Sequence, residues 1–177
     1  DGAVYSVDNV SNKPQLVISY TLPPQAPTAT SHSGISTASV TWTWTDNATA
    51  ETRYDIHDAA HSPVAGCTNL AANTQTCTAT GLTANTQYTR HPNVTDANGN
   101  TDGPAASAYT AIEAPSGITF GTVTAAGIDV GATGSFTNLS TASSGVWFQE
   151  GITATNSGWL TTNGWSKSGL TANTQYS

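Results

Sequence analysis

The chain has 177 residues, of which only 8% are charged, with 4 Lys and Arg residues against 11 Asp and Glu residues and a formal net charge of −7. Globular proteins usually carry about 25% charged residues, so this surface is polar but nearly uncharged. So few basic residues exclude a nucleic-acid binder, which needs clustered Lys and Arg, and exclude binding to an anionic membrane surface. No apolar run approaches the ~20 residues of a membrane-spanning helix, so membrane insertion is not expected.

Residues 1–22 precede the first predicted module. Two strands are expected here, Ala3–Val7 and Gln15–Thr21, either as the end of a preceding β domain or as strands donated to a neighbouring subunit. The next segment, Leu22–Pro27 (LPPQAP), is rich in proline and therefore stiff, and it leads into a first module predicted over residues 23–113.

The first module is predicted to be a series of strands. Ser39–Thr45 alternates Val40, Trp42 and Trp44 with Thr and Ser, a period of two that puts the large side chains on one face of a sheet. Turn signals recur about every 8–12 residues, as in a β sandwich, and no window shows a helical stripe. Further strands are predicted at Tyr54–His57, with Tyr54 and Ile56 on one face, and at Thr74–Thr80, Arg90–Thr95 and Ala108–Ile112.

A second module is predicted over residues 114–177, after the short joint Glu113–Pro115. Asn163-Gly164 is a two-residue turn signal and predicts a β-hairpin between the strands that flank it. Strands are expected at Thr119–Val123, at Gly127–Ala132 with Ile128 and Val130 facing inward, and at Gly145–Gln149.

An internal repeat supports this division. GLTANTQYT occupies Gly81–Thr89 and GLTANTQYS occupies Gly169–Ser177, an offset of 88 residues. One immunoglobulin-like sandwich spans roughly 100 residues, so the chain is predicted to hold two copies of one module. The second copy ends where its sixth strand should begin, so strands six and seven are expected to be missing, through truncation or because another chain donates them.

The repeated corner resembles the signature of fibronectin type III domains, which place a Leu and a Tyr six residues apart at the turn into the sixth strand. Here these residues are Leu82 and Tyr88, and again Leu170 and Tyr176. The resemblance implies an all-β fold of tandem immunoglobulin-like sandwiches. It also implies a tyrosine corner, in which the phenol packs inward and its hydroxyl bonds to nearby backbone.

The resemblance extends to the core tryptophan of the second strand, which Trp42 or Trp44 matches. The second module departs here, and Trp147 and Trp159 are expected to fill the volume from other strands. Upstream, Asn12–Thr21 (NKPQLVISYT) resembles the last strand of the bacterial surface domain called DNRLRE, which implies a larger surface protein.

Two cysteines, Cys67 and Cys77, are predicted to form a disulfide, because an even cysteine count in a Thr/Ser-rich, charge-poor chain is typical of an oxidising compartment. The alternative is two reduced thiols facing one core. Bonded, they would stabilise the first module by roughly 2–3 kcal/mol.

Two groups of residues are candidate ion sites. One is a run with oxygen ligands at alternate positions, Asp96, Asn98, Asn100 and Asp102, which could bind Ca²⁺ weakly or simply form a turn. The other comprises His57, Asp58, His61 and the neighbouring Asp55. A solvated loop is favoured there because the spacing matches no known metal site. Apart from possible Ca²⁺, no cofactor or metal is predicted.

Tryptophans outside the first module could contact a ligand. Trp147 and Trp165 are left open as possible aromatic contacts, whereas Trp159 is predicted to be in the core. His91, between Arg90 and Pro92, is interpreted as the start of a strand. Four glycosylation sequons begin at Asn9, Asn47, Asn93 and Asn138.

No nucleophile, zinc-protease or phosphate-loop motif occurs, and the lone Glu51 and Glu150 offer no paired carboxylates, so no enzyme is predicted. The expected function is a non-catalytic structural spacer or adhesion segment of a secreted or cell-surface protein, or a subunit of an extracellular filament. The alternative is a carbohydrate-binding accessory module of a secreted glycan-active enzyme. Expected partners are protein subunits or surface glycans, with a homopolymer formed by strand exchange as a further reading.

Overall fold

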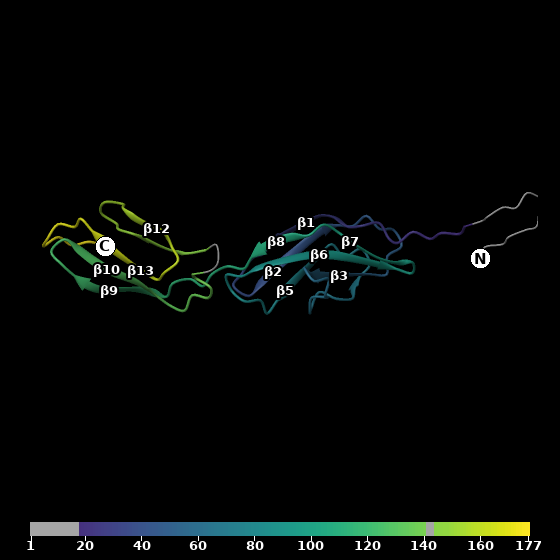
Figure 1. Ribbon diagram of the computed structural model, residues 1–177, viewed down its shortest axis with the longest axis horizontal. Coiled ribbons are helices and arrows are strands. Elements are labelled where there is room, and N and C mark those ends of the chain that lie inside the picture. The colour runs from purple at the N-terminus through teal and green to yellow at the C-terminus, as the bar shows by residue number, and fades with distance from the viewer. Residues whose placement is uncertain (1–17, 141–143) are drawn as a thin grey trace, which may run out of the picture.

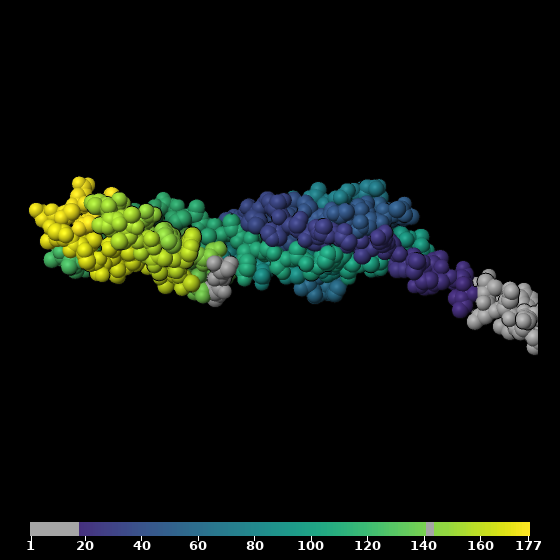
Figure 2. Space-filling view, turned by 90° about the horizontal axis from the view of Figure 1, so that it is seen from above, coloured from purple at the N-terminus to yellow at the C-terminus, as the bar shows by residue number. Residues whose placement is uncertain are grey.

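The computed structural model describes residues 18–140 and 144–177, which form two β sandwiches arranged end to end (Figures 1 and 2). Every regular element in these residues is a strand, which confirms the all-β prediction. Within the same ranges no helix has the length and apolar character to cross a bilayer. The expected strand Ala3–Val7 lies outside the described residues, as do residues 15–17 of the expected strand Gln15–Thr21. The remainder of that segment, residues 18–21, is described and forms no strand, so this part of the prediction is wrong.

Module 1 consists of two facing antiparallel sheets. One sheet has the strand order β1-β2-β5, and the other has the order β4-β3-β6-β7, with β8 also paired to β6. The strands are β1 (Thr28–Ser33), β2 (Ser39–Thr45), β3 (Arg53–Asp58), β4 (Leu70–Ala71), β5 (Thr76–Thr80), β6 (Gln87–Asp96), β7 (Gly99–Asp102) and β8 (Ala106–Tyr109).

The core of module 1 lies between these sheets and contains the residues that the alternation predicts. Strand β2 buries Val40, Trp42 and Trp44, and β3 buries Tyr54 and Ile56. Every second side chain of a strand points to the same face, so these residues meet in one layer. Burying such large side chains contributes about 1.5–3 kcal/mol each, which makes this core the main source of stability in module 1.

A break separates the last two strands of module 1. β7 pairs with the second half of β6 and β8 with its first half, and Gly103 lies between them. The Gly103 N–H donates to Pro92 O over 2.7 Å. A Cβ at this position would lie 2.9 Å from both Pro27 O and Pro92 Cγ. Only glycine therefore lets the chain pass this close to the proline-rich segment.

Module 2 repeats the arrangement at the predicted offset. The sheet β9-β10-β13 matches β1-β2-β5, and the pair β11-β12 matches β3-β4. β10 begins 88 residues after β2 (127 − 39) and β13 begins 88 residues after β5 (164 − 76). The strands are β9 (Gly117–Val123), β10 (Gly127–Thr133), β11 (Val146–Gln149), β12 (Asn156–Leu160) and β13 (Gly164–Ser168).

The hairpin predicted at Asn163-Gly164 is wrong. β12 pairs with β11 and β13 pairs with β10, so the chain crosses from one sheet to the other at this point. The crossing places Trp165 opposite Val130, where it packs on Phe148 of the facing sheet with ring centroids 6.4 Å apart. Burial of Trp165 between the sheets outweighs the local turn preference, because a hairpin would leave that core empty.

The core of module 2 is smaller than that of module 1. Its buried apolar residues are Ala132, Val146 and Phe148. All of β9 is exposed, including Ile118 and Phe120. In module 1, β3 pairs with β4 on one edge and with β6 on the other. In module 2, β11 pairs with β12 on one edge, and no strand of the described residues pairs with its other edge. One face of the second core is therefore open.

Candidate functional site

A row of polar side chains covers the outer face of the β3-β6-β7 sheet in module 1. Tyr54 and Ile56 point into the core, so the alternate residues of β3 point outward, and β6 and β7 follow the same alternation. The register places His57 directly opposite His91, and Asn93 directly opposite Asp102. Three neighbouring strands therefore bring two imidazoles and one carboxylate to the same patch.

A loop after β3 adds a third imidazole to this patch. Asp58 accepts hydrogen bonds from the backbone N–H groups of Ala60 and Ser62, and these bonds hold the pKa of Asp58 below its usual value. The tight turn gives His61 a positive φ of 59°. It directs the His61 ring over the sheet, 4.7 Å from the His91 ring by centroids.

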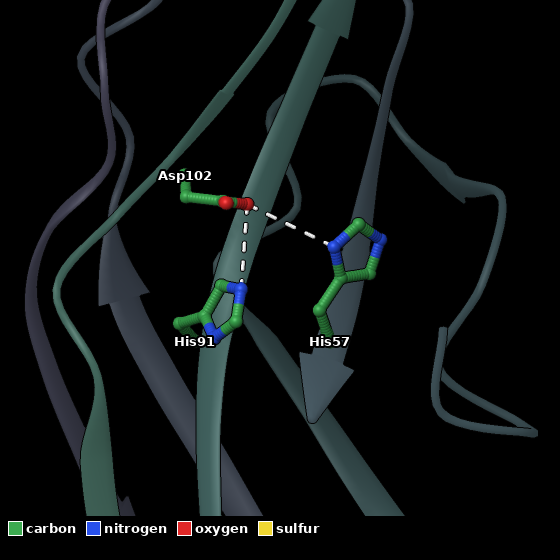
Figure 3. Close-up of side chains that lie close together, drawn as sticks. All are labelled: His57, His91 and Asp102. Carbon is green, nitrogen blue, oxygen red and sulfur yellow. Dashed lines mark ion pairs between the residues drawn. The ribbon is translucent and has the colours of Figure 1, made fainter. Parts of the chain in front are cut away.

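Four side chains surround the Asp102 carboxylate, namely those of His57, His61, His91 and Asn93. His61 Nδ1 lies 2.9 Å from Oδ2, while His91 Nε2 and His57 Nδ1 lie 3.4 Å and 3.8 Å from Oδ1. Figure 3 shows the rings of His57 and His91 turned toward the same carboxylate oxygen of Asp102. Asn93 Nδ2 also donates to Oδ1 over 2.7 Å and fixes its position. The group forms a small, pre-arranged set of nitrogen and oxygen ligands.

Burial divides this cluster into an inner and an outer part. The His91 side chain is only 6% exposed and that of His61 is 68% exposed. Burial lowers the pKa of His91, although the Asp102 charge opposes the shift, so its imidazole is neutral near pH 7. Burial by itself would raise the pKa of Asp102, but the Asn93 hydrogen bond and the nearby histidines outweigh it. The net effect is a pKa below the usual aspartate value, so the carboxylate stays charged.

The four candidate calcium ligands, Asp96, Asn98, Asn100 and Asp102, do not surround one point. Asp96 accepts from the Asn98 N–H within the β6-β7 turn. Asp102 pairs with Asn93, three rungs of the ladder away from Asp96, or about 10 Å at roughly 3.3 Å per residue. Calcium needs its oxygen ligands within about 2.6 Å of the ion, so Asp96 and Asp102 cannot share one.

Sequence reasoning found only part of the cluster. The sequence pattern groups His57 and His61 with Asp55 and Asp58, indicates a strand start at His91, and places Asp102 in a run that forms either a calcium site or a turn. Asp55 instead bonds Arg53 and the Asn69 N–H, and Asp58 caps its own turn. The missing information was the β3-β6 register, which joins residues 34 positions apart (91 − 57). Histidines at outward positions of two predicted strands were the available signal.

A second arrangement links the two modules through the repeated corner. Asn85, which has a φ of 48°, is fully buried, and its Nδ2 donates to the carbonyls of Thr137 and Asn138 over 3.2 Å and 3.1 Å. Asn138 Nδ2 donates in turn to Thr86 Oγ1 over 2.9 Å and to Ala84 O over 3.4 Å. Loops of the two modules therefore hold each other by reciprocal side-chain bonds.

Glu113 closes the same joint from the linker. Its carboxylate accepts from the Thr137 N–H over 2.9 Å and from the Thr137 hydroxyl over 2.5 Å. These bonds hold the pKa of Glu113 below its usual value. Asn173 is the repeat counterpart of Asn85, keeps a positive φ of 55°, and is exposed. Asn85 is covered both by module 2 and by the segment after β8, where its N–H donates to Ala111 O over 3.1 Å.

Both predicted tyrosine corners are present. The Tyr88 hydroxyl accepts from the Thr83 N–H over 2.9 Å, and the Tyr176 hydroxyl accepts from the Thr171 N–H over 2.8 Å. The backbones of Leu82 and Leu170 each donate over 3.0 Å to the residue 44 positions earlier, Ala38 and Ala126 (82 − 38 and 170 − 126). The corner is thus the same structure in both modules.

The predicted Cys67–Cys77 disulfide is also present. Cys67 is buried in the loop that pairs with β3, since the Ile56 N–H donates to Cys67 O over 2.8 Å. Cys77 lies on β5 of the other sheet. The bond therefore ties the two sheets of module 1 together.

The placement expected for Trp159 is wrong, because its side chain is 73% exposed. Trp147 and Trp159 are directly paired across β11 and β12, so both must lie on the same face. Phe148 and Val146 fill the core from the opposite face, which leaves both tryptophans outside. Neither supplies the volume of the missing core tryptophan, which Trp165 partly fills.

The exposed tryptophans form an aromatic pair on the surface of module 2. Their ring centroids are 5.5 Å apart with planes inclined by 61°, and Trp147 is 42% exposed. On the open side of the same module, an apolar groove of about 260 Å³ is lined by Ile118, Phe120, Ile128, Val130, Phe148 and Trp165, among others. Trp147 also lines this groove, so the groove and the tryptophan pair adjoin each other.

The sequons differ in what the fold allows. Asn93 is buried and its Nδ2 donates to Asn100 and Asp102, so it has no room for a glycan. Asn138 is engaged in the joint, and Asn47 donates to Ala26 O and to Thr28. Asn9 lies outside the described residues.

These features define a protein built from two tandem immunoglobulin-like β sandwiches. No family model matches the chain, and no curated protein matches it significantly. Several solved structures resemble it in shape. A two-domain fibronectin type III segment from chicken tenascin has 15% identity and a TM-score of 0.49 over 85% of this chain and 86% of that chain.

Two further solved structures match about half of this chain. The FN1–FN3 domains of chicken CNTN1 have 16% identity and a TM-score of 0.44 over 56% of this chain and 36% of that chain. An FN3 domain of human collagen XX has 21% identity and a TM-score of 0.41 over 51% of this chain and 93% of that chain. Because these identities and TM-scores are low, the fold of this protein is assigned from its own strand order and corner geometry.

Proposed function

We propose that this chain is a non-catalytic spacer segment of a secreted or cell-surface protein, in which two sandwiches form a semi-rigid rod. The joint between the modules is the observation that carries the proposal. Asn85 and Asn138 bond reciprocally across it, and Glu113 adds two bonds from the linker. A joint held on two sides resists bending, whereas a bare linker would let the modules swing independently.

The composition and the disulfide support an extracellular setting. A bond between the two sheets of module 1 persists in oxidising compartments and is rare in the reducing cytosol. The net charge of −7 favours solubility of the chain in an aqueous extracellular setting. The corner that forms the joint belongs to the repeat, and Asn173 presents the same backbone at the far end of module 2. Each module therefore carries its own means of docking.

The test compares two matched variants of the chain. Asn85→Gly and Asn173→Gly remove the same side chain from the same positive-φ corner, and glycine adopts that φ without strain. Only Asn85 contacts the other module. We expect Asn85→Gly to broaden the distribution of inter-module angles, seen as weakened alignment coherence between modules in residual dipolar couplings and as a shifted maximum dimension in small-angle X-ray scattering.

Asn173→Gly should leave both measurements at the wild-type values. If Asn85→Gly behaves like Asn173→Gly, the joint does not stiffen the rod and the spacer proposal loses its basis. If the wild-type modules already tumble independently, the proposal is wrong from the outset.

The second candidate function is carbohydrate binding by module 2, which the exposed Trp147–Trp159 pair favours. An exposed indole can stack on a sugar ring, and its neighbour at 5.5 Å can flank the ligand. Titration with soluble oligosaccharides of several linkages, followed by tryptophan fluorescence, tests this function. Binding should be lost in Trp159→Ala and kept in Phe120→Ala, which removes an exposed aromatic from another strand. No fluorescence change with any glycan would remove this candidate.

A further inference from the structure

The His–Asp cluster of module 1 has the make-up of a transition-metal site. His57 Nδ1, His91 Nε2 and an Asp102 carboxylate oxygen lie within 4.8 Å of one another. They come from β3, β6 and β7, three adjacent strands whose ladders fix their spacing. Two imidazole nitrogens and one carboxylate oxygen are typical protein ligands of zinc and related divalent ions.

Unsatisfied polar atoms point into the same space. His91 Nε2 and His57 Nδ1 are buried and have no hydrogen-bond partner. The His91 side chain is more than nine-tenths buried, so water does not readily satisfy it. Buried polar atoms are nearly always paired, and two orphaned nitrogens facing one carboxylate need an explanation. A bound cation would satisfy both nitrogens and the carboxylate at once.

A plain ion pair explains this geometry less well. One protonated histidine would satisfy Asp102, and the exposed His61 already lies 2.9 Å from Oδ2. His91 Nε2 and His57 Nδ1 still face Oδ1 at 3.4 Å and 3.8 Å, beyond good hydrogen-bond length. An ion pair therefore accounts for His61 and leaves the two inner rings unexplained.

We propose that His57 Nδ1, His91 Nε2 and Asp102 Oδ1 bind one divalent transition-metal ion of the zinc type, while His61 and Asn93 orient the carboxylate. Figure 3 shows the three ligands directed at a common space. Tetrahedral zinc at about 2.0–2.1 Å sets its ligand atoms about 3.3 Å apart, so the side chains need to close by roughly an ångström. Rotation of the His57 side chain, whose Nδ1 lies farther from Oδ1 than His91 Nε2 does, would supply this movement while Asn93 keeps Oδ1 in place.

The ligand set also selects the class of ion. Calcium and magnesium prefer sites made entirely of oxygen, so two imidazoles disfavour them. Zinc, copper and nickel accept imidazole nitrogen together with carboxylate oxygen. The ion would bridge β3, β6 and β7 and, through His61, the loop that covers them. Binding should therefore stabilise module 1 in particular.

The test uses the whole chain after chelator treatment and dialysis. Isothermal titration calorimetry with Zn²⁺ should show one ion per chain, and Zn²⁺ should raise the thermal midpoint where equal Ca²⁺ does not. His57→Gln, His91→Gln and Asp102→Asn should each weaken binding at least tenfold. His61→Gln should weaken it about 10-fold or somewhat more, as loss of an orienting partner does. The matched control is His32→Gln, an exposed histidine of the same module outside the cluster.

Imidazole ¹⁵N chemical shifts of the unaltered chain keep the proposal testable even if the buried His91 variant does not fold. Zn²⁺ should shift the resonances of His57 Nδ1 and His91 Nε2 and leave those of His32 unchanged. No saturable binding of Zn²⁺, Ni²⁺ or Cu²⁺, or binding that survives all three ligand substitutions, overturns the proposal. Binding of Ca²⁺ that depends on Asp102 but on neither inner histidine overturns it as well.

Discussion

Asn85 and Asn138 exchange side-chain hydrogen bonds across the joint between the two modules. Each amide reaches backbone carbonyls of the opposite loop, and both residues have a positive φ. Asparagine tolerates this conformation better than other non-glycine residues, so it can shape the loop and supply the amide together. One residue type thus meets both the backbone and the bonding needs of the joint.

Acid should loosen this joint. The bonds from Thr137 lower the pKa of Glu113, so their contribution is fully present above the usual glutamate pKa of about 4.3 and is lost as the pH falls through the lowered value. We expect the inter-module alignment to weaken in that acidic range, measured by residual dipolar couplings between pH 6 and about pH 3. Glu113→Gln should show the loosened joint at every pH. An acid transition of the same size in Glu113→Gln would show that another group is responsible.

Reducing the disulfide should destabilise module 1 alone. Cys67 and Cys77 are 10 residues apart, and closing such a loop contributes about 2–3 kcal/mol by restricting the unfolded chain. Urea unfolding with and without reductant, followed by tryptophan fluorescence, measures the difference in free energy of unfolding. Resonances of module 2 provide the internal control and should keep their unfolding midpoint. An unchanged midpoint for module 1 after complete reduction, confirmed by intact mass, would contradict this prediction.

Loss of the corner hydroxyl should have a small, local cost. Tyr88→Phe keeps the ring but leaves the Thr83 N–H without its acceptor, which should lower the free energy of unfolding by about 1 kcal/mol. Tyr109→Phe is the matched control, because its hydroxyl makes no hydrogen bond to any described residue and the change should be near zero. Equal effects of the two substitutions would mean that the corner bond contributes nothing.

The open groove of module 2 should promote association between chains. Ile118 and Phe120 are exposed on β9, and no described strand covers the edge of β11. Exposed apolar surface next to an unpaired strand edge favours pairing with another chain, the basis of the predicted strand exchange. We expect light scattering to give a native mass above the 18.1 kDa of one chain, and Phe120→Ser to reduce it. A single-chain mass at high concentration would rule out strand exchange through this groove.

The local pattern of the chain was enough to predict much of the fold. The alternation of Val40, Trp42 and Trp44 identified a core strand because side chains of a strand have a strict period of two. The repeated corner located both modules, since its Leu and Tyr are close in sequence and their contacts are local. The two cysteines also pair, because they lie on neighbouring segments of one small module.

Other features depended on contacts between distant residues. The turn signal at Asn163-Gly164 was overridden because Trp165 packs against Phe148 in the other sheet. Trp159 lies outside because its partner in the ladder, Trp147, lies outside, and a sequence does not reveal ladder register. Asn85 is buried and Asn173 is exposed although their sequence neighbourhoods are the same.

The sequence by itself determined the main core strands, the two modules and their corners, because these follow from side-chain periodicity and from short-range bonds, whereas β1, β4 and β7 were not predicted. Only the tertiary structure decided the joint and the His57–His91–Asp102 cluster. Both depend on which rungs of separate strands, or which loops of separate modules, come to lie opposite each other. That pairing is chosen by the burial of the whole core, to which residues far apart in the chain contribute together.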